Sequence, residues 1–174
     1  MDEDSNASEF DEADFHILDR LESDREINLS ELADEIGLSK SAIHYRLNNL
    51  KEEGVVTGIS ADLDPQAFGL EMMIVTEVMV RHETGYAENI GEQLAEIGGV
   101  NQVYYAMGDV DFIVVSRTQN RDQMNDLIEE IIEIDGVNET SSTFIMDEFK
   151  RNGRVLENMS DEMRDAVCKS SGDE

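Results

Sequence analysis

Residues 37–51, GLSKSAIHYRLNNLK, are the stretch on which the fold prediction depends, and they contain no aspartate or glutamate. The whole chain of 174 residues has 41 Asp and Glu against only 13 Lys and Arg. With about a quarter of all positions acidic, a run of this length without acid has a chance of about 1 to 2%, and charge is the default at exposed positions. Lysine, histidine and arginine stand there instead, so we expect this stretch to face a partner that repels carboxylates.

The same residues have the periodicity of an amphipathic helix. Ser39 is a candidate N-cap, three aliphatic side chains recur on one side, and a glycine stops the pattern. A second helical pattern precedes it over residues 28–37, with the capping-box-like pair Asn28 and Glu31 at its start and Gly37 at its end. Two helices joined by the turn GLS, the second of them amphipathic, form the helix-turn-helix pattern.

The outward face of this predicted second helix is suited to DNA. If the aliphatic residues Ile43, Leu47 and Leu50 face inward, hydrogen-bonding side chains in the first turns point outward to base edges, and basic side chains flank them for phosphates. The alternative is an ordinary exposed helix that lacks acids by chance. The predicted DNA contacts are Ser39, Lys40, Ser41, His44, Tyr45, Arg46, Asn48 and Lys51.

A third helical pattern comes first in the chain, over residues 11–24. Phe15, Leu18 and Leu21 recur at three-residue spacing, with Ile17 beside them. Residues 1–10 and 169–174 are predicted to be solvated tails.

The formal net charge of −28 needs its own explanation, because a negative surface normally repels nucleic acid. The acids are spread along the whole chain and lysine is scarce, which is typical of a carboxylate coat that keeps a protein soluble in a very salty cytoplasm. At such salt the Debye length is about 3 Å, so the net charge does not exclude DNA. The alternative is a specific acidic binding role.

Other bulk properties place the chain among cytoplasmic globular proteins. Its 40% apolar content is enough for a packed core, and Cys168 is its one cysteine, so no internal disulfide framework exists. No apolar run approaches the roughly 20 residues of a membrane span, and the acidic N-terminus lacks a signal region.

After Pro65, the only proline, the period of the pattern changes. Strands are predicted over residues 72–80, 101–107, 111–118 and 138–149, with helices over 84–99 and 121–136. The order βαββαβ is the ferredoxin-like arrangement. The similar segments IGGVNQV and IDGVNET, each between a helix and a strand, agree with its internal repeat.

Two polar segments of this second part could form a ligand site. Gly108 and Asp109 form a tight turn between two strands, and Asp111 follows; residues 140–143, TSST, bring hydroxyl groups to the last strand. Carboxylates and hydroxyls beside backbone carbonyls can hold the ammonium and carboxylate of an amino acid. The alternatives are plain turn chemistry and a polar strand edge.

Signatures of an enzyme are lacking. The chain has no phosphate-binding loop, no dinucleotide-binding loop, no nucleophile elbow and no plausible Cys-His pair, so we expect no catalytic residues and no cofactor. His44 has no partner at helical spacing, and His16 and His82 fall in other elements, so no metal site is predicted.

The segments LSKSAIHYRLNNLKEEGVV, GISADLDPQAFG and GDVD, in this order, resemble the Lrp/AsnC family of transcription regulators. The resemblance implies an α+β protein with a helix-turn-helix domain over 11–54, a linking strand or hinge over 55–70, and a ferredoxin-like effector-binding and oligomerisation domain over 71–150. Residues 151–174 are a tail beyond the usual family end, expected to be either a short helix or disordered.

The resemblance also implies partners. Family members are typically dimers, often assembled into octamers, that bind double-stranded promoter DNA, and amino acids commonly act as effectors. The acidic composition indicates a halophilic archaeal member. By position, the effector residues would be Met107, Gly108, Asp109, Asp111, Thr140, Ser141 and Thr143.

The leading hypothesis is therefore a sequence-specific transcription regulator that responds to an amino acid or a related metabolite. Two alternatives stay open. One is a non-specific architectural DNA binder, and the other is a metabolite sensor that acts through a protein partner.

Overall fold

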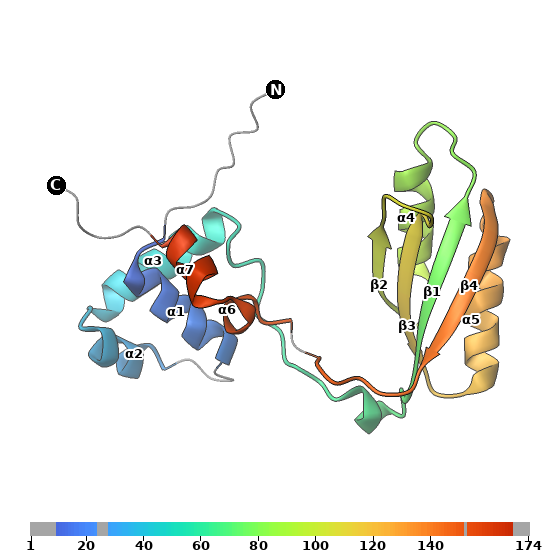
Figure 1. The fold of residues 1–174 in the computed structure, drawn as a ribbon. Helices are drawn as coiled ribbons and strands as arrows, with labels where there is room; N and C mark the ends of the chain where they lie inside the picture. The colour runs from blue at the N-terminus through green and yellow to red at the C-terminus, as the bar shows by residue number, and fades with distance from the viewer. Residues whose placement is uncertain (1–9, 24–27, 152, 169–174) are drawn as a thin grey trace. The chain divides into compact units, whose positions relative to one another are not determined.

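The computed structural model describes residues 10–23, 28–151 and 153–168 (Figure 1). The predicted tails, residues 1–10 and 169–174, therefore lie outside the described residues except for Phe10. The chain forms two compact units. The helical unit contains the residues up to Asp62 together with those from 152 onward, and the sheet unit contains Leu63–Arg151.

Three helices form the first part of the helical unit, as the sequence predicts: α1 (Glu12–Ser23), α2 (Leu29–Ile36) and α3 (Lys40–Glu52). The side chain of Asn28 accepts from Ser30 N at the start of α2, and Gly37 ends this helix in the left-handed conformation. Ser39 caps α3, its Oγ accepting from Ala42 N at 3.1 Å. The buried core of the unit is Ile17, Leu32, Ala33, Ile43, Leu47 and Leu50.

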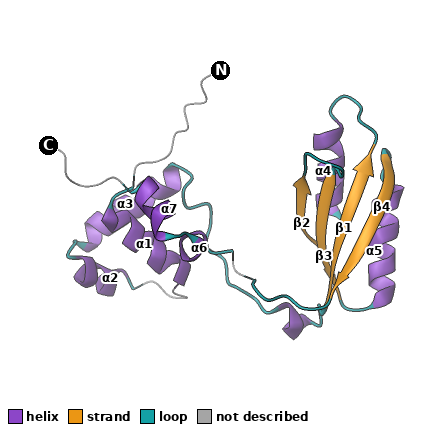
Figure 2. Cartoon of the chain, in the orientation of Figure 1, coloured by secondary structure: helices purple, strands orange, loops and turns teal. Residues whose placement is uncertain are grey.

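The segment predicted to be a C-terminal tail, 151–174, is folded over most of its length. It forms two short helices, α6 (Val155–Asn158) and α7 (Asp161–Val167), which belong to the helical unit (Figures 1 and 2). Leu156 is buried, with an exposed fraction of 7%. The helical unit is therefore built from both ends of the chain.

The linking strand predicted within residues 55–70 is absent from the structure, where this segment has no ladder. Val55 N and Val56 N both donate to Leu50 O, at 2.9 and 3.0 Å, so the segment starts as a cap on α3. A short 3-10 helix, η1 (Pro65–Phe68), follows. A strand exists only beside a partner strand, and the single chain offers none to this segment.

The sheet unit has the predicted βαββαβ order: β1 (Met72–Val80), α4 (Tyr86–Glu96), β2 (Val100–Tyr105), β3 (Phe112–Thr118), α5 (Arg121–Glu133) and β4 (Val137–Ile145). The strand order is β2-β3-β1-β4, and every neighbouring pair is antiparallel. This confirms the ferredoxin-like prediction, with β4 four residues shorter at its end than the predicted strand over 138–149.

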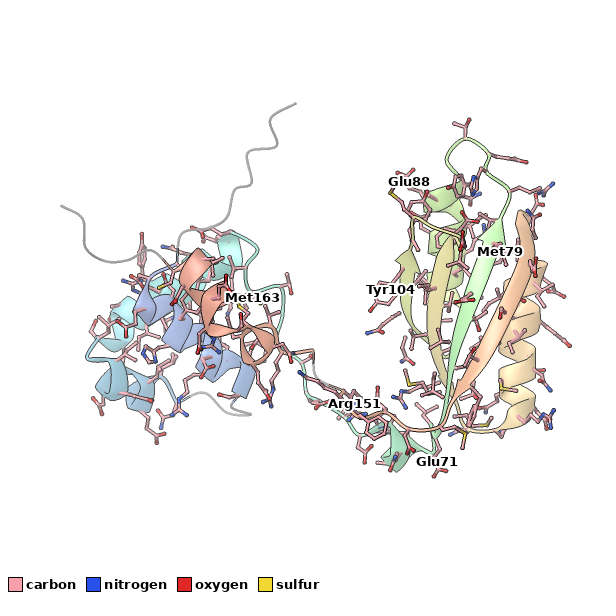
Figure 3. All side chains as sticks on the ribbon, in the orientation of Figure 1. Glu71, Met79, Glu88, Tyr104, Arg151 and Met163 are labelled. Atoms are coloured by element: carbon pink, nitrogen blue, oxygen red, sulfur yellow. The ribbon has the colours of Figure 1, made fainter. Side chains whose placement is uncertain are left out.

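Helices α4 and α5 cover one face of the sheet (Figure 2). Their buried residues pack on alternate residues of β1 and β3, among them Val78, Phe112 and Val114. The opposite face, here called the open face, has no cover from the described residues of the sheet unit itself. Figure 3 labels Met79 and Tyr104, two of its members. By register, the open face consists of Met73, Val75, Glu77, Met79, Gln102, Tyr104, Ile113, Val115, Arg117, Glu139, Ser141, Thr143 and Ile145.

Within the described ranges, the structure has no helix with the length and apolar character that crossing a membrane requires.

Candidate functional site

Helix α3 presents its polar face to solvent. Lys40, Ser41, His44, Asn48 and Lys51 are all exposed. Tyr45 is exposed as well, at 68%, although a large aromatic side chain gains free energy by burial. In the part of the chain that the structure describes, neither lysine of this helix has an ion-pair partner. The predicted base-contacting and phosphate-contacting residues therefore lie together on one accessible surface.

Arg46 lies differently from the other predicted DNA contacts. Its Nη1 contacts Asp11 Oδ2 at 2.7 Å and Asp14 Oδ1 at 2.8 Å. These two aspartates also cap α1 reciprocally, since Asp14 N donates to Asp11 Oδ1 and Asp11 N donates to Asp14 Oδ2. Arg46 thus joins α3, the predicted DNA-contacting helix and here called the recognition helix, to the start of α1. Its predicted phosphate contact stays a prediction beside this internal role.

The ion pair changes the protonation of its members. Burial opposes the ionisation of Asp11, but the N–H of Asp14 and the guanidinium of Arg46 outweigh it and lower the pKa of Asp11. A carboxylate whose pKa is depressed on folding stabilises the folded state above its unfolded pKa, about 4, and loses this contribution as the pH falls through its folded pKa. We expect the helical unit to lose stability below about pH 4.

Replacing Arg46 by alanine is expected to lower the free energy of unfolding of the helical unit by about 2 kcal/mol, because two partly buried carboxylates lose their charged donor. Thermal and urea denaturation followed by circular dichroism measure the change. Lys51→Ala is the matched control and should stay within about 0.5 kcal/mol of wild type. If Arg46→Ala weakens DNA binding but leaves stability unchanged, the contact with α1 has no structural importance.

The Gly-Asp-Val-Asp turn begins β3, and its second aspartate is fixed inside the sheet unit. Asp111 Oδ2 accepts from Val80 N at 2.8 Å, and Oδ1 lies 2.6 Å from His82 Nε2. Burial opposes the ionisation of Asp111, but these two contacts dominate and lower its pKa. Asp109 and Met107, by contrast, are exposed, the latter at 97%. Asp109 is the aspartate of the turn that remains accessible to a ligand.

An aromatic cluster adjoins this turn. His82 stacks on Tyr86 with ring centroids 4.8 Å apart, and the hydroxyl groups of Tyr86 and Tyr105 lie 2.7 Å apart. The hydrogen bond with Tyr105, together with desolvation and nearby charge, raises the pKa of Tyr86 to about 12. No sequence pattern predicted that His82, Tyr86 and Tyr105 form a cluster. Their positions along the chain gave the only sequence signal for this cluster. The end of β1 pairs with the start of β3, so residues that follow β1 lie near the Gly-Asp-Val-Asp turn.

The predicted hydroxyl ligands lie on both faces of β4. Thr140 pairs with Val78 and so faces the helices, whereas Ser141 and Thr143 pair with Glu77 and Val75 on the open face. Neither of the two cavities, one at Gly99 and Thr118 and one at Glu12 and Cys168, is lined by these residues or by the turn. A cavity of about 380 Å³ exists in the sheet unit, but it lies at the far end of β3, beside Gly99, Arg117 and Thr118.

The two aspartates of the turn are expected to respond differently to substitution. Asp111→Asn should lower the free energy of unfolding of the sheet unit by about 1 to 3 kcal/mol, because Val80 N and His82 contact different carboxylate oxygens and an amide has only one oxygen. Asp109→Asn, the matched control, should leave stability unchanged and weaken amino-acid binding, measured by calorimetry. Equal effects of the two changes on stability would contradict this assignment.

Across the described residues, no three His, Cys, Asp or Glu side chains are grouped so that they could hold a metal ion.

A helix-turn-helix with an exposed, acid-poor second helix, joined to a separate α+β unit, defines the class of helix-turn-helix transcription regulators. Family models agree in both units: a winged helix-turn-helix DNA-binding model matches residues 10–57, and the Lrp/AsnC ligand binding domain matches residues 74–155. The chain belongs to the Lrp/AsnC family of DNA-binding transcription regulators.

Relatives of known name support this assignment. The HTH-type transcriptional regulator FL11 of Pyrococcus horikoshii is 32% identical over 136 residues, which are 78% of this chain and 89% of that protein. The feast or famine regulatory protein of M. tuberculosis, solved in complex with L-methionine, is 28% identical with a TM-score of 0.75, covering 84% of this chain and 98% of its own. An AsnC family regulator from Agrobacterium tumefaciens shares the fold, with a TM-score of 0.79 at 24% identity, covering 87% of this chain and 100% of its own.

Proposed function

We propose that this regulator binds specific promoter sequences as a homodimer or a larger assembly in the cytoplasm of a halophilic archaeon, and that an amino acid or a related metabolite controls it. It has no catalytic activity in this proposal and needs no metal or cofactor. The main observation behind the proposal is the exposed face of α3, which has no acid before Glu52 in a chain of net charge −28.

The side chains of this face suit DNA in two ways. Ser41, His44 and Asn48 offer donors and acceptors that match base edges in a major groove. Lys40 and Lys51 at the two ends of the helix suit phosphates. Because so few basic groups are present, few counterions are released on binding, and affinity should depend only weakly on salt concentration.

The open face of the sheet supports a dimer. Val75, Val115 and Ile113 form an apolar centre on this face. Two copies that pack through this face would bury the apolar centre and tie two recognition helices together. A symmetric dimer of this kind binds two half-sites about one helical turn apart.

The predicted ligands offer suitable partners for both charged groups of an amino-acid effector. Asp109 can receive an ammonium group, and hydroxyl groups such as those of Ser141 and Thr143 can donate to a carboxylate. In this proposal a second copy completes the site, because Asp109 lies in the turn before β3 whereas Ser141 and Thr143 lie on β4. The methionine bound by the mycobacterial relative supports an effector of this chemical class.

The carboxylate coat supports the halophilic assignment. With 41 Asp and Glu, self-repulsion in dilute buffer is large, and concentrated salt screens it. We expect the melting temperature of the protein to rise with the concentration of KCl and to reach its maximum only at molar KCl.

The test is genome-wide mapping of bound DNA with and without each candidate amino acid, followed by footprinting on the promoter of the protein's own gene. Discrete protected sites whose occupancy changes with one amino acid support the proposal. Equal affinity for promoter and random DNA would indicate an architectural binder, and no DNA binding would indicate a sensor that acts through a protein. A steep decrease of DNA affinity with KCl concentration would mean that many counterions are released, which would contradict the small number of phosphate contacts proposed.

A further inference from the structure

The C-terminal segment 154–168 follows helix α1 over its whole length. At the C-terminal end of α1, both carboxylate oxygens of Glu22 accept backbone N–H groups of α6, from Val155 at 2.7 Å and Leu156 at 2.9 Å. At the opposite end, Cys168 forms an isolated parallel β-bridge with Phe10, just before α1 begins. The segment, here called the strap, is therefore held at two points that α1 separates.

The strap is also fixed by the burial of Leu156 near its first end and by the contacts of Arg164 further along. Leu156 is buried, whereas its neighbour Val155 is 65% exposed. Arg164 on α7 donates to Leu156 O at 2.7 Å, which joins the two short helices, and it lies 3.9 Å from Asp19 on α1. The contact of Arg164 with Asp19 joins α7 to α1, and its contact with Leu156 O joins α7 to α6.

The placement of Glu22 agrees with a function in docking. A carboxylate in the last turn of a helix is unfavourable for that helix, because the negative end of the helix dipole lies there. In this chain the carboxylate instead satisfies two N–H groups at the start of α6, which would otherwise lack partners. The acid at the end of α1 therefore stabilises the docked strap rather than its own helix.

The end of the strap lies next to the anchor of the recognition helix. Phe10, which pairs with Cys168, precedes Asp11, and Asp11 is one of the two carboxylates that hold Arg46 of α3. Phe10 also packs on the core of the helical unit and meets Phe15 edge-on, at 5.9 Å between ring centroids. A continuous set of contacts thus leads from the strap through the start of α1 to the helix that faces DNA.

We propose that residues 154–168 form an intramolecular strap that holds the start of α1, and with it the Arg46 anchor of the recognition helix, and that undocking of the strap lowers the affinity of the regulator for its operator. The chain leaves the helical unit after Asp62 and returns to it at residue 152, just before the strap. The two units are therefore connected by the backbone at two places. The effect on DNA depends on the DNA-binding function assigned above, whereas the docking itself does not.

The only cysteine of the chain makes the docking measurable. Cys168 is half-buried at the end of the strap, so its rate of reaction with a maleimide reports the undocked fraction in the complete protein. Leu156→Ala should raise this rate at least about tenfold, because it removes the buried anchor of the strap. Val155→Ala changes the neighbouring exposed side chain and keeps the backbone N–H groups, so it should label at the wild-type rate.

The second measurement is affinity for a DNA fragment from the promoter of the protein's own gene. The double variant Glu22→Gln/Leu156→Ala should be mostly undocked and bind about tenfold more weakly, since apparent affinity falls with the competent fraction. Val155→Ala should bind as wild type. Wild-type binding to the fragment tests the proposed function separately.

Two outcomes would overturn the strap. One is an unchanged Cys168 labelling rate in Leu156→Ala, which would mean that the segment is not docked in this way. The other is fast labelling of the double variant together with wild-type affinity for DNA, which would mean that docking does not affect the recognition helix. Should the double variant fail to fold, labelling of Leu156→Ala with and without saturating DNA decides: by linkage, DNA must slow the reaction, and an unchanged rate contradicts the proposal.

Discussion

Replacing Asn48 by alanine is expected to reduce operator affinity by about 30-fold or more. Asn48 lies on the exposed face of α3, and an asparagine that pairs with a base edge contributes about 1 to 3 kcal/mol of discrimination. A dimer loses two such contacts, or about 2 to 6 kcal/mol, and each 1.4 kcal/mol is a factor of about ten. Fluorescence anisotropy with operator and with random DNA measures the loss, which should be confined to the operator.

The matched control is Asn125→Ala, an exposed asparagine on α5 in the sheet unit, which should bind operator as wild type. Lys51→Ala provides a second comparison, since loss of a phosphate contact weakens binding to operator and random DNA alike. An equal loss of affinity for both kinds of DNA in Asn48→Ala would show that this residue contacts the backbone and that the helix is placed differently in the groove.

Replacing Val115 by arginine is expected to convert the proposed dimer into monomers. Val115 lies near the centre of the open face, opposite Val75 on the neighbouring strand. A dimer through this face would bury two unpaired guanidinium groups, and an uncompensated buried charge costs about 3 to 5 kcal/mol. The dimer dissociation constant should rise by at least about 1,000-fold, measured by analytical ultracentrifugation in molar KCl.

Ala95→Arg adds the same charge on an exposed position of α4 and should leave the dimer intact. Operator binding by Val115→Arg should weaken as well, because the second half-site contact is then no longer intramolecular. If Val115→Arg remains a dimer with an unchanged melting temperature, the copies associate through another surface.

Local features of the sequence predicted the local structure well. Asn28, Gly37 and Ser39 were expected at helix ends and are found there, because capping depends on residues two to four positions apart. The period change after Pro65 likewise predicted the order of strands and helices in the sheet unit. These signals lie within single elements, where periodicity alone is informative.

Contacts between distant residues were not predictable in the same way. Arg46 was expected to contact phosphates, but its partner Asp14 is 32 residues away, and a chain with 41 acids gives no indication of which carboxylates pair. His82 and Asp111, 29 residues apart, present the same difficulty. The prediction of a linking strand within residues 55–70 was wrong for a related reason, since a strand depends on a partner strand that its own sequence does not specify.

The discontinuous helical unit has a consequence for the order in which the protein is made. The contacts of Glu22 with the strap join residues 133 and 134 positions apart, with the whole sheet unit between them. At about 5 to 20 residues per second, a ribosome needs roughly 7 to 27 seconds to add that length of chain. Helices α1 to α3 are therefore synthesised long before the strap, and a chain released early lacks it. A strap that strengthens operator binding would give complete chains an advantage over unfinished ones in competition for the same promoter.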